Sequence, residues 1–70
     1  MDLNWTDGFE ISFRIDESGA GVISANREGL LSLAAHLRAL AEEPFGAHIH
    51  LDRYNSLEDG SEDLIFEKTE

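Results

Sequence analysis

Residues 47–52 read Ala47-His48-Ile49-His50-Leu51-Asp52, a run in which apolar and polar side chains alternate. Alternate side chains of an extended chain project from the same face. The run therefore predicts a strand that buries Ala47, Ile49 and Leu51. Its other face is expected to carry His48, His50 and Asp52, three side chains of the kinds that bind metals.

The chain downstream of this strand predicts a loop and a final strand. Asp52 to Ser61 is polar and irregular, with a turn signal at Asp59-Gly60. The following run, from about Glu62 to Lys68, places Leu64 and Phe66 on one face. We expect this pair to face the core, because it is larger than Ile65 on the other face.

The first half of the chain predicts a hairpin and a helix. Phe9 to Ile15 alternates with period two, Asp16 to Gly19 has turn chemistry, and Gly21 to Ala25 reads as a short strand. A helix from Arg27 to Glu42 follows, with Asn26 as N-cap and Pro44 beyond its end. The predicted apolar stripe of this helix consists of Leu30, Leu33, Ala34, Leu37, Leu40 and Ala41. We expect His36 at the helix surface and Trp5 folded back over the core.

These elements predict a single α+β domain spanning residues 1–70, in the order β-β-α-β-β. A helix that returns along the sheet favours one four-stranded antiparallel sheet with strand order 2-1-3-4. The helix packs on one face of that sheet, which makes a two-layer architecture. The other face is predicted to be polar and available to a partner or to a second copy in a homodimer.

Composition excludes several classes of function. Fifteen acidic and five basic residues give a formal net charge of −10, which argues against nucleic acid and anionic membranes as partners. The chain has no cysteine, no positively charged leader and no apolar run near the roughly 20 residues that span a bilayer, so we expect a cytoplasmic protein. Because no nucleophile elbow or phosphate-binding glycine pattern is present, we predict neither catalysis nor a cofactor.

Two kinds of site remain open. His48, His50 and Asp52 could form a small metal-binding module or hydrolase, although side chains of a single strand point in parallel rather than converge. Alternatively, acidic side chains around the loop could attract a basic protein, and Tyr54 could serve as an aromatic anchor. The predicted partner-binding residues are His48, His50, Asp52, Tyr54, Glu58, Asp59, Glu62 and Asp63.

The segment from Gly46 to Lys68 resembles the C-terminal half of a family of small α+β immunity proteins from bacterial polymorphic toxin systems, the thirty-second in the usual numbering. The resemblance implies a protein that binds and neutralises a cognate toxin, without catalysis. An acidic surface is compatible with such an inhibitor, if the toxin is basic. The residues that carry the resemblance include His48, His50, Leu51, Asp52, Ser56, Leu57, Glu58 and Ser61.

Overall fold

The computed structural model describes residues 4–70 and confirms the α+β class. Its elements follow the predicted order: β1 Ile11–Ile15, β2 Gly21–Ala25, α1 Arg27–Ala41, β3 His48–Leu51 and β4 Leu64–Glu67. The helix ends one residue before the predicted end, with Glu42 as its C-cap. This difference is within the ordinary fraying of a helix terminus.

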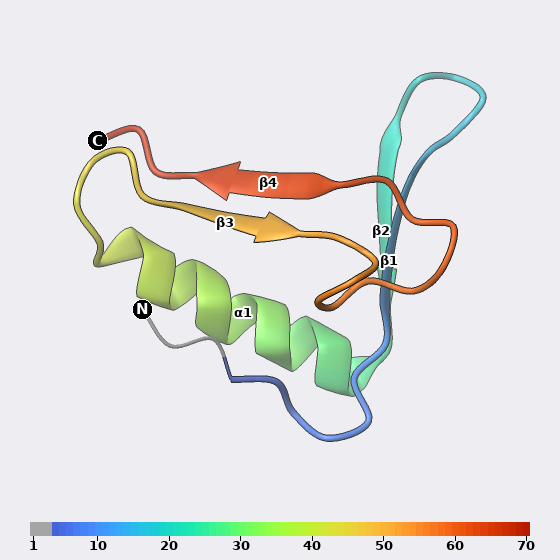
Figure 1. Cartoon of the computed structure of the whole chain (residues 1–70), viewed down its shortest axis with the longest axis horizontal. Helices are drawn as coiled ribbons and strands as arrows, with labels where there is room; N and C mark the ends of the chain where they lie inside the picture. Colours follow the sequence, from blue (N-terminus) through green and yellow to red (C-terminus); the bar gives the residue numbers. More distant parts are fainter. Residues whose placement is uncertain (1–3) are drawn as a thin grey trace.

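The strands form two separate two-stranded antiparallel sheets, so the predicted four-stranded sheet of order 2-1-3-4 is wrong. In the first sheet Phe13 pairs with Ile23, and in the second Ile49 pairs with Phe66. The β3–β4 sheet lies along α1, whereas the β1–β2 hairpin stands across the end at which the helix begins (Figure 1).

The edge of β1 that faces away from β2 is already occupied, which explains why β3 does not pair with it. The backbone N–H of Glu58 donates to the Ile11 carbonyl at 2.8 Å, and that of Glu62 donates to the Phe13 carbonyl at 2.8 Å. The N–H of Phe13 donates to Ser61 Oγ at 3.2 Å. The loop between β3 and β4 therefore occupies the edge that the predicted sheet assigned to β3. Alternation along a strand does not reveal which segment satisfies its edge.

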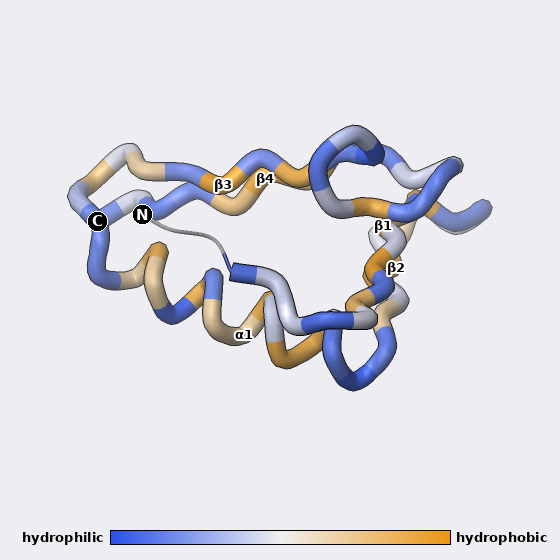
Figure 2. The backbone as a smooth tube through the Cα atoms, turned by 60° about the horizontal axis from the view of Figure 1, so that its bottom comes forward, coloured by the Kyte–Doolittle hydropathy of each residue, from blue (hydrophilic) through white to orange (hydrophobic). Residues whose placement is uncertain are grey.

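The core lies between α1, the inner face of β3–β4 and the base of the hairpin. Its buried residues are Ile11, Leu33, Leu40, Ile49, Leu51 and Leu57, with Leu64 and Phe66 packed against them. The predicted inward faces of β3 and β4 are therefore confirmed. The tube coloured by hydropathy shows apolar segments on both β3 and β4 (Figure 2). The hairpin extends beyond this core, and Ile15 near its tip is 54% exposed.

The buried face of α1 is rotated relative to the predicted stripe. Leu30 and Leu37 are exposed, whereas Ser32 and His36 are buried. The N-terminal segment lies against these two polar residues: the Thr6 N–H donates to Ser32 Oγ at 2.9 Å, and His36 Nε2 donates to the Asn4 carbonyl at 2.8 Å. The expectation of a surface position for His36 is thus wrong: the residue is 3% exposed, and its Nε2, though not its Nδ1, has a hydrogen-bond partner on the buried face.

Trp5 folds back over the core, as predicted. Its ring stacks on Phe9 at a centroid distance of 4.6 Å and meets His36 edge-on at 4.2 Å. Aromatic pairs at these separations add to the free energy gained by burying their surface. The N-terminal segment is therefore held to α1 by both polar and aromatic contacts.

Both ends of α1 are tied to the strands. Asn26 caps the helix by accepting from the Gly29 N–H at 2.8 Å, and it also accepts from the Glu10 N–H at 3.0 Å. A Cβ on Gly29 would lie 2.5 Å from the Glu10 carbonyl oxygen, so only glycine permits this approach. At the other end, Lys68 Nζ donates to the carbonyls of Ala41 and Glu43 at 2.7 and 2.6 Å, where the helix dipole favours a cation.

The hairpin turn gives the fold a testable pH dependence. The Ser18 hydroxyl, together with backbone N–H groups led by that of Ala20, holds the pKa of Asp16 below its ordinary value of 3.8. A lowered carboxylate pKa stabilises the folded state above the unfolded pKa, and this contribution is lost as pH falls through the folded pKa.

Asp16→Asn is therefore expected to lower the urea midpoint at pH 7, because the neutral amide accepts these hydrogen bonds less well. The difference from wild type should shrink as pH falls from about 3.8 through the lower pKa of the folded state, where the folded wild-type carboxylate itself becomes protonated. Urea titrations of both proteins across this pH range measure it. An equal difference at all pH values would contradict the assignment.

Candidate surface for protein binding

The outer face of the β3–β4 sheet points away from the helix and carries four residues. His48 lies opposite Glu67, and His50 lies opposite Ile65. All four residues are exposed. His50 Nε2 lies 3.1 Å from Asp63 Oδ2, which joins this outer face to the end of the loop. The predicted common face of His48 and His50 is therefore present.

Asp52 does not stand beside the two imidazoles as a third ligand. It lies just past the end of β3, and its Oδ1 accepts from the N–H groups of Tyr54 and Asn55 at 2.9 and 3.1 Å. Within residues 4–70, no group of three histidine or acidic side chains could hold a metal ion. Asp52 shapes the start of the loop, so the arrangement gives no support to a metal centre.

The loop from Asp52 to Asp63, here called the acidic loop, has a defined backbone. The Asp52 carbonyl accepts from the N–H of Leu57 at 2.8 Å and also from those of Asn55 and Ser56. The Asn55 side chain accepts from the Asp52 N–H and donates to the His50 carbonyl, closing the turn after β3. Leu57 then inserts into the core, where it is only 5% exposed.

The acidic side chains of this loop point to solvent although its backbone is fixed. Glu58 and Glu62 use their N–H groups to bond β1, while their side chains, like those of Asp59 and Asp63, belong to exposed residues. Together with Asp52, the loop has five acidic residues against one arginine. Because the backbone is already fixed, a partner that binds these carboxylates would order only their side chains.

Tyr54 is the aromatic residue of the loop, and it is 83% exposed. Arg53 Nη2 donates to Tyr54 Oη at 2.9 Å, and the guanidinium carbon lies 5.0 Å from the ring centroid. The pair is amphipathic, and it lies in the same loop as the acidic side chains. Tyrosine and arginine are both enriched among residues that dominate binding energy at interfaces.

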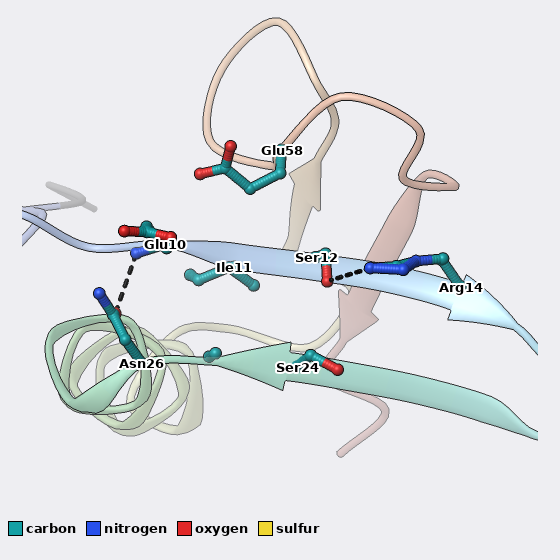
Figure 3. A pocket seen from close by; sticks show the side chains of 8 residues that line it. Glu10, Ile11, Ser12, Arg14, Ser24, Asn26 and Glu58 are labelled. Atoms are coloured by element: carbon teal, nitrogen blue, oxygen red, sulfur yellow. Dashed lines mark hydrogen bonds between the residues drawn. The ribbon is translucent and has the colours of Figure 1, made fainter.

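Sequence reasoning missed an open groove on the polar face of the hairpin. Glu58 from the acidic loop overhangs β1, and Ser24 of β2 lies on the opposite side (Figure 3). The groove is lined by Glu10, Ile11, Ser12, Arg14, Ser24, Ala25, Asn26 and Glu58. Only the contact between the loop and β1 brings Glu58 here. The alternation of Glu10, Ser12 and Arg14 in the sequence did indicate the polar side chains that line the β1 side of the groove.

In the part of the chain that the structure describes, no helix is long and apolar enough to cross a membrane. The fold is that of a small α+β protein with exposed acidic side chains on the loop between β3 and β4. The family model for Immunity protein 32 (Imm32) matches residues 22–69, which is more than half of the sequence. The chain therefore belongs to the Imm32 family of immunity proteins, whose role is toxin-neutralising binding. Searches of curated proteins and of solved structures returned no significant match.

The structure separates the residues that carried the family resemblance into two groups. Leu51 and Leu57 are buried in the core, Asp52 caps the loop, and Ser61 accepts from the Phe13 N–H. These four residues have structural roles in β3 and the acidic loop. Only His48, His50 and Glu58 of the more polar positions are exposed and able to meet a partner directly.

Leu57→Ala tests whether burial of this side chain holds the acidic loop in place. Truncating a buried leucine leaves a cavity, and we expect a loss of about 3 kcal/mol in the free energy of unfolding. Ile65→Ala is the matched control, because Ile65 is 59% exposed on the outer face and should change stability by about 0.5 kcal/mol or less. Urea titrations compare the two, and equal effects would contradict the role of Leu57.

Proposed function

We propose that this protein acts in the cytoplasm as a non-enzymatic inhibitor that binds a basic toxin domain. The binding surface in this proposal comprises the acidic loop and the outer face of the β3–β4 sheet. The observation that carries it is the cluster of Glu58, Asp59, Glu62 and Asp63, exposed on a loop whose backbone is bonded to β1. Family membership supports toxin neutralisation as the purpose of this surface.

Electrostatics favours a basic partner. A net charge of −10 raises the encounter rate with positively charged proteins and disfavours negatively charged ones. Tyr54, stacked with Arg53, provides an aromatic contact beside the charged cluster. In the proposed complex, carboxylates steer the toxin into place, and the loop covers the basic groups that the toxin needs for its own substrate.

Growth rescue tests the function itself. The toxin candidate is the C-terminal domain encoded by the adjacent open reading frame, expressed in a host with and without this protein. We expect the domain alone to stop colony formation and co-expression to restore it. A toxic domain that this protein neither binds nor relieves would contradict the pairing and remove the support for an inhibitor role.

Charge reversal tests the acidic loop. In Glu58→Lys/Asp59→Lys, we expect the association rate with the toxin domain to fall about tenfold at low salt, because electrostatic steering is lost. The difference should narrow as salt rises, since exposed charges are screened. Stopped-flow or surface-plasmon measurements give the rates.

Glu42→Lys/Glu70→Lys is the control of equal charge change. Both residues are exposed; Glu42 is the C-cap of α1, and Glu70 is the last residue described. Figure 1 shows the end of α1 and the C-terminus on the side opposite to the loop between β3 and β4. This variant should associate at a rate much closer to wild type. If the two double variants slow association equally, only net charge matters and the loop is not the binding surface.

A further inference from the structure

The outer edge of β2 is open, in contrast to that of β1. Antiparallel pairs alternate between bonded and non-bonded residues. The bonds from Asp16 to Ala20 and from Asn26 to Glu10 fix this alternation in the hairpin. The backbone groups of Gly21 and Ile23 consequently point away from β1, and they have no hydrogen-bond partner among residues 4–70.

The same alternation explains how the acidic loop covers the outer edge of β1. On β1 the outward groups belong to Ile11 and Phe13, which are the residues bonded by Glu58, Ser61 and Glu62. The chain thus covers one edge of its hairpin with its own loop and leaves the other uncovered. An exposed strand edge is a template for pairing with another chain.

The composition of β2 permits another strand to pair with this edge. Its five residues, Gly21–Ala25, include no charged residue and no proline, the usual means of blocking strand addition. Val22 and Ile23 are each 42% exposed. The outer edge of β4 is also open, but that strand includes Glu67 and follows Asp63 directly in sequence, so charged side chains flank its backbone.

We propose that an extended basic segment of the partner toxin adds to the outer edge of β2 as a third strand of the hairpin sheet. This inference rests on the proposed function and names a second contact in the same complex. Main-chain hydrogen bonds to Gly21 and Ile23 supply affinity, and alternate side chains supply specificity, as in other cases of strand addition.

Charge complementarity selects a basic segment over a second copy of this chain. Asp16 and Glu17 lie at the hairpin tip, and Glu10 and Glu28 lie near the base of β2, against Arg14 and Arg27. Two acidic copies would repel each other. A strand added at β2 would lie two strand spacings, roughly 10 Å, from β1. A lysine or arginine side chain and that of Glu10 in the groove (Figure 3) together span that distance.

Amide hydrogen exchange measured by NMR tests the proposal, with the toxin domain used for growth rescue as the probe. In the free protein, the amides of Gly21 and Ile23 should exchange fast, while those of Val22 and Ser24 are slowed by β1. In the complex, Gly21 and Ile23 should exchange at least about tenfold more slowly.

Other exchange patterns overturn the inference in distinguishable ways. If the toxin domain slows amide exchange in the acidic loop but not at Gly21 and Ile23, strand addition at β2 is refuted and the proposed function stays intact. Protection of Ile65 and Glu67 instead would assign the added strand to β4. Slow, concentration-dependent exchange of Gly21 and Ile23 in the free protein would identify a second copy as the occupant. Absence of any association would refute both proposals.

A variant pair supplies an independent measurement. Ile23→Pro removes the outward N–H without removing a donor to β1, whereas Ile23→Thr keeps the N–H and the β-branched shape. We expect the dissociation constant to rise about tenfold or more in the proline variant, and to change little in the threonine variant. Equal affinities for the two variants would overturn strand addition, and circular dichroism verifies that each is folded.

Discussion

The bonds between the acidic loop and the edge of β1 are the interaction on which the rest of the structure depends. Through the N–H groups of Glu58 and Glu62, and through Ser61, they join two sheets that share no strand pairing. They also place Leu57 in the core between them. We call these hydrogen bonds between the acidic loop and β1 the joint. Without them, the hairpin would contact the rest of the molecule chiefly through the start of the helix.

The segment that stabilises the contact between the two sheets also carries the carboxylates of the proposed binding surface. Backbone groups of the loop face inward and satisfy β1, while its carboxylates face outward. At Glu58 and Glu62 the backbone N–H bonds β1, while the carboxylate remains available to a partner. A contact made by the carboxylate would therefore leave the hydrogen bond to β1 intact. Asp52 is the exception, because its Oδ1 accepts from the N–H groups of Tyr54 and Asn55 within the loop.

Much of the local structure could be predicted from the sequence. The alternation around Ile49 and Leu51 indicated the correct buried face of β3, and Asn26 indicated the helix start. Sheet pairing could not be predicted, since period-two patterning is indifferent to the neighbour at an edge. The buried positions of Ser32 and His36 also escaped prediction, because a polar residue is buried when a distant segment satisfies it, here residues 4–6. For the site, the exposed acidic residues were visible, but the groove depended on the unpredicted joint.

The sequence distance bridged by the joint has a consequence for how the protein forms. Each hairpin and the helix are made from neighbours along the chain, whereas Phe13 and Ser61 are 48 residues apart. Closing so long a loop carries an entropic cost that local elements do not meet. The local strand pairs and the helix can therefore assemble early, and the acidic loop reaches its final shape only when it meets the edge of β1. On the ribosome, the acidic loop can then mature only after β1, β2, α1 and β3 have been synthesised.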